Sequence, residues 1–384
     1  MPHTDLLQPP IVITHPDQLA ALIESLEQAG RFALDTESNS MHAYHYQICL
    51  IQISTDRQDY IIDPLALSDL TPLGGLVARE DIEITMHAAE NDVLLLNKDF
   101  GWIFGNLFDT LWGARILGWQ RPGLASIMQE QFGVTLDKRM QRTDWGKRPL
   151  SAEQLAYARM DTHFLLSLRD RIEQALREVG CWGEAQDVFA ALRSIRWREK
   201  AAATIWRLSG VRELTPDQLA VLNVLFDWRE KRASQRNVPS YRIMRNEILL
   251  ALARQQPTTE QRLMRTPGIS QRFPSHLARK LASLIRSARH APPPPPPERH
   301  YNGHRMDEVE TARYEALRRW RLHKAQQRGV EVDVVMTNAL LETLARAHPA
   351  SLQELAALNL LGSWRLQAYG QEVLDVMQSV SAAA

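Results

Sequence analysis

The chain has 384 residues, enough for two or three domains that each bury a core of their own. Hydrophobic residues make up 45% of it and charged residues 23%, so the composition excludes collagenous, wholly disordered and disulfide-scaffold proteins. The 45 basic and 45 acidic side chains cancel, and this neutrality taken alone argues against a polyanionic partner.

The charge is distributed unevenly along the chain. Residues 1–180 hold 15 Lys and Arg against 25 Asp and Glu, a net charge of −10, so residues 181–384 carry the balancing +10. The window 211–290 holds 15 basic and 6 acidic residues, whereas 301–384 holds 9 and 10. The sequence therefore predicts an acidic first part, a basic middle module and a neutral last module.

The cysteine count and the hydropathy pattern bear on the cellular compartment. Cys49 and Cys181 are too few for a disulfide framework or a zinc cluster, so we expect small buried hydrophobes in a reducing compartment. No apolar run approaches the roughly 18 residues of a membrane span, and the first residues do not resemble a secretory signal. We expect a cytoplasmic protein that has no membrane partner and no obligate protein partner.

The first part of the chain alternates strand-like and helical patterns. The predicted strands are residues 11–13, 31–35, 49–53, 59–63 and 82–86, and helical spacing covers 17–30 and the run that follows His87. Three strands separated by turns, followed by strand–helix alternation, predict an α/β or α+β domain with a mixed sheet flanked by helices.

After about residue 150 the pattern is helical. Ser151 and Gln154 form a capping box that predicts a helix running through Tyr157, Asp161 and Leu165. Past Cys181 the helices are shorter, and six consecutive prolines at 292–297 predict an extended spacer. The predicted domains are residues 1–180, 211–290 and 301–384, with a proline-rich linker at 291–300.

The segments on either side of the prolines repeat each other. At a constant offset of 92 residues, Trp228-Arg229 matches Trp320-Arg321 and Leu252-Ala253-Arg254 matches Leu344-Ala345-Arg346. Identities at Trp, Asn and Pro in one register over about 30 positions predict a duplicated all-helical bundle. The register breaks after Leu355.

Three groups of residues within positions 1–180 carry acidic side chains that could together bind a ligand. Asp35 and Glu37 leave a buried strand two residues apart, Asp92 starts an apolar helical run, and Tyr157 and Asp161 share a helix face. Each alone has an ordinary interpretation: a turn or cap residue, a first-turn acid, or a half-buried helix face. Together, four carboxylates without a histidine or cysteine cluster favour hard divalent cations, Mg²⁺ or Mn²⁺.

These motifs resemble those of a known enzyme family. Asp35-Thr36-Glu37, the stretch from His87 to Asp92, and the stretch from Tyr157 to Asp161 look like the three motifs of the DEDD superfamily of 3′-5′ exonucleases, in the subclass with Tyr in the third motif. Phe108-Asp109-Thr110 and residues 144–150 are similar to stretches of the ribonuclease D family within it. The duplicated module resembles the helicase-and-RNase-D C-terminal (HRDC) domain, and the order of modules is that of the same family.

The resemblance implies a fold, a reaction and a set of site residues. It implies a ribonuclease H-like α/β exonuclease domain followed by two helical bundles, and a 3′-5′ exoribonuclease that acts on tRNA precursors by two-metal-ion hydrolysis. Asp35, Glu37, Asp92 and Asp161 would hold two divalent metal ions (Mg²⁺ or Mn²⁺), and Tyr157 would position the attacking water. The neutral second module departs most from the pattern, which puts its role in nucleic-acid binding in doubt.

Basic residues in two regions are the expected contacts to RNA phosphates, which attract Lys and Arg without regard to sequence. The candidates are Lys138, Arg139, Arg142, Lys147 and Arg148 before the third motif, and Arg242, Arg245, Arg272 and Lys280 in the basic module. Two alternatives stay open: a DNA 3′-5′ exonuclease with the same carboxylates, and a non-catalytic RNA-binding protein or helicase partner.

Overall fold

The computed structural model describes residues 9–137, 139–199, 203–296 and 306–381. The chain divides into two compact units: one comprises Met1–Ser38, Ile48–Trp197 and Tyr301–Ala384, and the other comprises Asn39–Gln47 and Arg198–His300. No helix of the described residues is long and apolar enough to cross a membrane.

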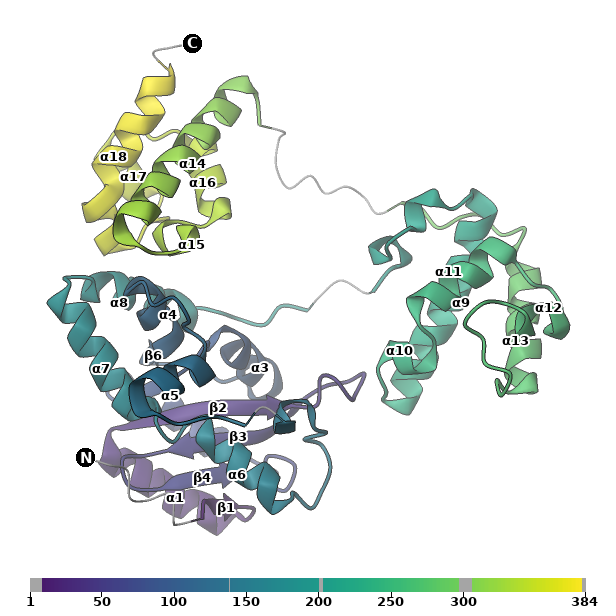
Figure 1. Ribbon diagram of the computed structural model, residues 1–384, viewed down its shortest axis with the longest axis horizontal. Helices are drawn as coiled ribbons and strands as arrows, with labels where there is room; N and C mark the ends of the chain where they lie inside the picture. The colour runs from purple at the N-terminus through teal and green to yellow at the C-terminus, as the bar shows by residue number, and fades with distance from the viewer. Residues whose placement is uncertain (1–8, 138, 200–202, 297–305, 382–384) are drawn as a thin grey trace. The chain divides into compact units, whose positions relative to one another are not determined.

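A mixed sheet forms the centre of the first domain, as the sequence predicts (Figure 1). It has six strands, and the last of them was not among the predicted strands. Its strands are β1 (Ile11–Ile13), β2 (Arg31–Ser38), β3 (Ile48–Ser54), β4 (Asp59–Ile62), β5 (Glu83–Met86) and β6 (Leu107–Asp109). The spatial order is β1-β4-β3-β2-β5-β6. β3 runs antiparallel to both of its neighbours, whereas β2, β5 and β6 are parallel, so the carboxyl ends of these three strands meet at one edge.

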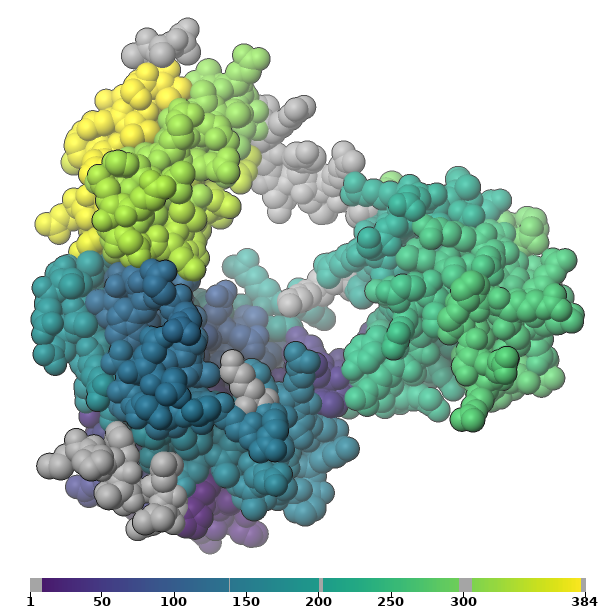
Figure 2. All heavy atoms as spheres, in the orientation of Figure 1, coloured from purple at the N-terminus to yellow at the C-terminus, as the bar shows by residue number. Residues whose placement is uncertain are grey.

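Helices cover the sheet. They are α1 (Pro16–Ala29), α2 (Thr71–Val77), α3 (Glu90–Phe100), α4 (Thr110–Ile116), α5 (Leu124–Phe132), α6 (Ala152–Met160), α7 (Leu165–Glu178) and α8 (Trp182–Arg193). Helix α6 packs against β3 and β4, α7 against β2 and β5, and α8 against β6. All seven residues of β3 are buried, as expected for a strand covered on both faces. In the space-filling view, the face of the sheet domain that is shown consists mostly of blue to teal atoms, which belong to residues that follow β5 (Figure 2).

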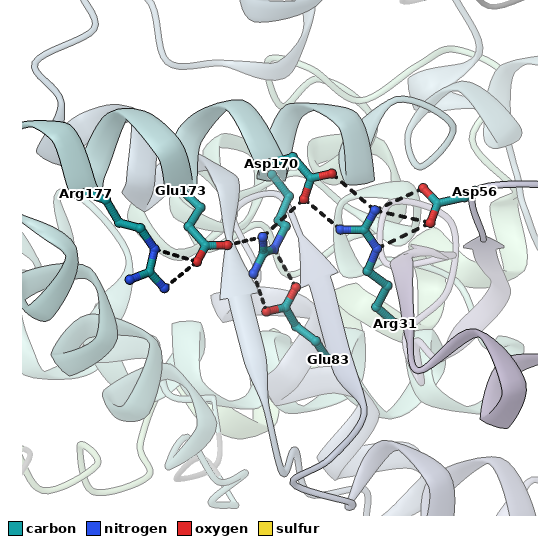
Figure 3. Close-up of polar contacts among 7 residues, drawn as sticks. Arg31, Asp56, Glu83, Asp170, Glu173 and Arg177 are labelled. Atoms are coloured by element: carbon teal, nitrogen blue, oxygen red, sulfur yellow. Dashed lines mark hydrogen bonds and ion pairs between the residues drawn. The ribbon is translucent and has the colours of Figure 1, made fainter.

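An ion-pair network fastens α7 to the starts of two strands (Figure 3). Arg31 of β2 lies between Asp170 of α7, at 2.6 Å, and Asp56, at 3.2 Å. Arg169 of α7 reaches Glu83 of β5 at 2.6 Å and Asp170 at 3.1 Å. Single surface ion pairs contribute little, but a network orders each side chain against several partners at once. The network therefore sets the position of α7 on the sheet.

The helix predicted to run from Ser151 past Leu165 is two helices in the structure. Ser151 caps α6 together with Gln154, as predicted, but α6 ends at Met160 and α7 begins at Leu165. The intervening turn is tied to the sheet by Thr162, whose hydroxyl lies 2.7 Å from the Ser54 hydroxyl. The prediction of one continuous helix was wrong because this contact with a distant strand outweighs the local helical preference.

Two helical bundles follow the sheet domain, and they are copies of one module. The first helical module contains α9 (Pro216–Arg236), α10 (Ser240–Ile243), α11 (Asn246–Gln255), α12 (Glu260–Met264) and α13 (Ser275–Ala288). The second helical module contains α14 (Glu308–Arg328), α15 (Val332–Val335), α16 (Asn338–Ala347), α17 (Leu352–Ala357) and α18 (Ser363–Ser381). Each module has a hydrophobic core of its own.

The duplication extends to a buried arginine. The first three helices of the two modules have equal lengths and start 92 residues apart. Arg229 donates to the carbonyl of Met244 at 3.3 Å, and its counterpart Arg321 donates to the carbonyl of Met336 at 2.8 Å. These equivalent contacts confirm the predicted repeat. Within the predicted linker at 291–300, residues 297–300 lie outside the described part of the chain.

Candidate active site

The first acidic motif lies at the carboxyl end of β2. This strand extends to Ser38, three residues beyond its predicted end, and places Asp35 opposite Gln52 and Glu37 opposite Leu50 of β3. Because β2 and β5 are parallel with Ala33 opposite Thr85, the end of β5 lies at the level of Leu34, and the next residue, His87, is level with Asp35. The first two motifs therefore meet at the same sheet edge.

Asp92 reaches this edge from the first turn of α3. Its Oδ1 accepts a hydrogen bond from the hydroxyl of Thr36, the residue between the two acids of β2. The turn that leads into α3 is unusual, because Ala88 has a left-handed φ of +60°. Asp109, at the end of β6, holds this turn by accepting hydrogen bonds from the backbone N–H groups of Ala88 at 3.3 Å and Ala89 at 2.7 Å.

The third motif lies at the end of α6. The hydroxyl of Tyr157 is hydrogen-bonded to the carboxylate of Asp161, four residues later. The Tyr157 ring packs on Trp145, with 5.9 Å between ring centroids. Trp145 is 1% exposed, so it belongs to the core and fixes the orientation of the tyrosine.

A cavity of about 380 Å³ joins the motifs within the sheet domain. Asp35, Glu37, Tyr157 and Asp161 line it. Its other walls are Thr36, His87, residues 123–126 at the start of α5, Leu136, Asp137 and Gln141. Asp92 is not part of the cavity wall; it acts on the site through its contact with Thr36 and through its charge.

Each of the four acidic side chains is hard to ionise, because it is buried and lies near other acids. Burial, followed by the charges of neighbouring acids, raises the pKa of Asp35 well above its usual value and that of Glu37 to about 9. Burial raises the pKa of Asp92 to about 6 and that of Asp161 to about 7. Like charges gathered in a poorly solvated cavity hold protons unless cations neutralise them.

This donor set fits divalent metal ions by its chemistry. All four side chains offer the carboxylate oxygens that Mg²⁺ and Mn²⁺ prefer, and their raised pKa values show that the site lacks positive charge. Among the described residues, no three acidic, histidine or cysteine side chains are arranged closely enough to enclose a cation as they stand. Asp92 and Asp161 are instead engaged by the hydroxyls of Thr36 and Tyr157, contacts that a bound cation would replace or share.

The basic candidates near the third motif differ in their surroundings. Arg139 is exposed but pairs with Asp137 at 2.6 Å, and Arg142 and Lys147 are exposed. Lys138 lies outside the described residues. The Arg148 guanidinium is bound within the domain by Asp63, at 2.5 Å, and by backbone carbonyls that include that of Cys49. Arg148 thus fastens the segment that carries Trp145, a role that the basic cluster in the sequence did not indicate.

The candidates in the first helical module lie on its surface. Arg242, Arg245, Arg272 and Lys280 are all exposed. Arg242 also donates to Nδ1 of His42, at 3.1 Å, within the same compact unit. Among the described residues the side chains of Arg245, Arg272 and Lys280 make no hydrogen bond or ion pair, so they are available to a ligand.

Sequence reasoning assigned no role to three features of the site. His87 opens the second motif and lines the cavity, but a lone histidine has no periodic pattern to mark it. Thr36 lies between the two acids of the first motif, and nothing in the sequence shows that its hydroxyl contacts a third acid. The wall formed by residues 123–126 and by the segment that contains Leu136 and Gln141 comes from loops and a helix start, where sequence alone predicts position least well.

Comparisons with known proteins agree with this geometry. A family model described as a 3′-5′ exonuclease matches residues 10–177, and a model of the HRDC domain matches residues 218–285 and 310–377. Ribonuclease D of Zymomonas mobilis is 33% identical over 285 residues, which cover 72% of this chain and 72% of that relative.

Two other similar proteins match part of the chain or nearly all of it. Exosome complex component 10 of Rattus norvegicus is 32% identical over 262 residues, but this chain spans only 29% of its length. The crystal structure of Escherichia coli RNase D, described as an exoribonuclease involved in structured RNA processing, is 25% identical with a TM-score of 0.66. That match covers 97% of this chain and 99% of the other.

Proposed function

The chain belongs to the ribonuclease D family of 3′-5′ exonucleases, and from this premise we propose that it removes nucleotides one at a time from RNA 3′ ends by metal-dependent hydrolysis. One observation carries the proposal: Asp35 and Glu37 of the first motif and Tyr157 and Asp161 of the third line a single cavity, together with His87 of the second motif. Burying several carboxylates close together is unfavourable in free energy, and a protein that only bound RNA would gain nothing from it.

Asp35, Glu37, Asp92 and Asp161 are the residues that would hold two divalent cations, Mg²⁺ or Mn²⁺. When bound, such ions neutralise charge on the phosphodiester and favour ionisation of a water molecule. The protein contributes a set of acids whose pKa values are raised without cations, so that binding of cations and loss of protons are linked.

Tyr157 holds and orients the attacking water in this proposal. Its hydroxyl faces the cavity and is paired with Asp161, and burial, followed by the nearby acids, raises its pKa above the usual value. The phenol therefore stays protonated at neutral pH and acts as a hydrogen-bonding group rather than as a base. Packing of its ring on Trp145 keeps the hydroxyl in place.

RNA is the proposed substrate, with tRNA precursors that carry 3′ extensions as its class. Arg139, Arg142 and Lys147 near the third motif would attract the phosphate backbone, and so would Arg245, Arg272 and Lys280 of the first helical module. Such contacts are independent of sequence and suit an enzyme that shortens RNAs of many sequences. The cytoplasm is the proposed compartment, as expected from the cysteine count and the hydropathy pattern of the sequence.

A comparative digestion tests this proposal. Purified protein with Mg²⁺ or Mn²⁺ is given three 5′-labelled substrates: a tRNA with an extended 3′ end, a single-stranded RNA and a matched single-stranded DNA. We expect stepwise shortening of both RNAs and none with Asp161→Asn. Faster removal of DNA would indicate a DNA exonuclease instead, and binding without shortening would indicate a non-catalytic RNA-binding protein.

A further inference from the structure

His87 lines the cavity beside the carboxylates, and the reaction as described above gives it no task. It directly follows β5, level with Asp35 of the neighbouring strand. Within the described part of the chain, its imidazole is hydrogen-bonded on one side only: Nδ1 lies 2.9 Å from the hydroxyl oxygen of Thr110, the first residue of α4.

The Thr110 hydroxyl determines which ring nitrogen of His87 carries the proton. Thr110 is fully buried, and its hydroxyl donates its single hydrogen to the backbone carbonyl of Met86, at 3.1 Å. A hydroxyl has one proton to donate, so towards His87 the oxygen acts only as an acceptor. Nδ1 must therefore be the protonated nitrogen of the ring.

The other nitrogen of His87 is left as a hydrogen-bond acceptor. Burial lowers the pKa of His87 to about 4, so the ring is neutral at physiological pH and carries only the proton on Nδ1. Among the described residues, none donates a hydrogen bond to Nε2. His87, a residue of the cavity wall, thus carries an unused acceptor, and the Thr110–Met86 chain fixes the orientation of its ring.

The chemistry of a nucleotide limits what can donate to this acceptor. Phosphate oxygens carry no proton at neutral pH and cannot donate. Base edges can donate, but the groups differ among the four bases, and an exonuclease that depended on them would stop at certain bases. The hydroxyls of the sugar are the donors that every ribonucleotide shares.

We propose that Nε2 of His87 accepts a hydrogen bond from a ribose hydroxyl of the 3′-terminal nucleotide and so makes His87 a specificity-determining residue for the sugar. This inference rests on the proposed function, since it places the terminal nucleotide in the cavity with the carboxylates. If the donor is the 2′-hydroxyl, His87 favours RNA over DNA; if it is the 3′-hydroxyl, His87 selects a free 3′ end.

A substrate-and-variant comparison tests the proposal. Three RNAs of identical sequence end in a ribonucleotide, a 2′-deoxynucleotide or a 3′-deoxynucleotide, and release of that last nucleotide is measured in single turnover. For the unaltered protein, loss of the contacting hydroxyl should slow release about tenfold, the effect of one buried hydrogen bond whose acceptor is left unsatisfied. In His87→Leu the same loss should change the rate by less than about twofold.

Two further variants keep the test decisive if His87→Leu is unstable. His87→Gln supplies a carbonyl acceptor in the same region and should restore part of the discrimination, whereas the exposed control His276→Leu should discriminate like the unaltered protein. Equal discrimination by the unaltered protein and His87→Leu, for both deoxy substrates, would overturn the proposal. Failure of the proposed function would look different, because no RNA would then be shortened by the unaltered protein.

Discussion

The carboxylate of Asp59 on β4 is bound at 2.6 Å by the guanidinium of Arg159 on α6, and both side chains are almost fully buried. Nδ1 of His163 also lies 2.8 Å from the same carboxylate. Arg159 and His163 flank Asp161 in the sequence, on either side of the point where α6 ends. This buried pair therefore fixes the turn that presents Asp161, one of the four acids proposed to hold the metal ions.

Replacing Asp59 with Asn should destabilise the fold and reduce activity together. The substitution leaves the Arg159 charge buried without a counter-charge, and loss of one partner of a buried ion pair costs about 3–5 kcal/mol. Urea unfolding measures the loss. The control is Asp56→Asn, whose exposed carboxylate pairs with Arg31 and should cost about 1 kcal/mol or less. Equal losses for the two variants would contradict this account.

The lowered pKa of Asp59 also leads us to expect that the protein loses stability in acid. Burial acts to raise its pKa, but hydrogen bonds from His163 and Ser54 and the charge of Arg159 outweigh burial, so the pKa lies below its usual value. A lowered pKa in the folded state contributes stability that is present at neutral pH and lost as the pH falls through that pKa. Unfolding experiments between pH 6 and pH 3 should show this loss in the unaltered protein and a smaller one in Asp59→Asn.

The four carboxylates of the site predict the opposite pH dependence for the metal-free protein. Their pKa values are raised on folding, to about 9 for Glu37, 7 for Asp161 and 6 for Asp92. The stability they contribute is complete below the ordinary carboxyl pKa near 4 and is lost as the pH rises towards 9. Metal-free protein should therefore melt at a lower temperature at pH 8.5 than at pH 6.

Divalent cations should reverse this loss. Cations that replace the protons stabilise the folded state more at high pH, where fewer protons compete, so Mg²⁺ or Mn²⁺ should raise the melting temperature more at pH 8.5 than at pH 6. Calorimetric scans with and without the cation measure the difference. In Asp161→Asn the increase should shrink, whereas an increase that is unchanged in this variant would mean that the cation binds elsewhere.

Tyr157→Phe should reduce turnover about a hundredfold or more while leaving the fold and cation binding intact. The variant keeps the ring that packs on Trp145 and removes only the hydroxyl that faces the cavity. Single-turnover hydrolysis of a short RNA gives the rate. Tyr60→Phe, in β4 and outside the cavity wall, is the matched control and should retain full activity. Activity of Tyr157→Phe equal to that control would remove the tyrosine from the mechanism.

Removing basic side chains from the first helical module should weaken RNA binding without changing sequence preference. In an Asp161→Asn background, which prevents digestion, Arg272→Gln and Lys280→Gln should each lower the affinity and reduce the salt dependence of binding by about one unit of slope. Fluorescence anisotropy at several salt concentrations gives both quantities. Arg319→Gln, an exposed arginine of the neutral second module, should have little effect. A salt dependence that neither Arg272→Gln nor Lys280→Gln alters would exclude this surface of the first module.

The sequence predicted the sheet domain and the repeated bundles well because their signals are local or periodic. Buried β-branched runs mark β3 and β4, and the capping box at Ser151 marks the start of α6. The offset of 92 residues predicts the repeat, and the first three helices of the two modules have equal lengths at this offset. The five candidate site residues could be named from the sequence because each motif keeps its own spacing.

The remaining features depend on contacts between residues far apart in the sequence. The break between α6 and α7 follows from Ser54 meeting Thr162, and the internal role of Arg148 follows from its contact with Asp63. The direction of the His87 ring depends on Thr110, 23 residues away. The two residues of each pair are far apart in the sequence, and no periodic pattern links them.

The most direct test of the central claim is digestion of a 5′-labelled single-stranded RNA by the unaltered protein and by Asp35→Asn, each with Mn²⁺ or with a chelator. The account predicts a ladder that shortens from the 3′ end and releases nucleoside 5′-monophosphates, only with the unaltered protein and only with the cation. The conservative control Asp56→Asn should give the same ladder as the unaltered protein. Internal cleavage, or equal shortening by Asp35→Asn, would contradict it.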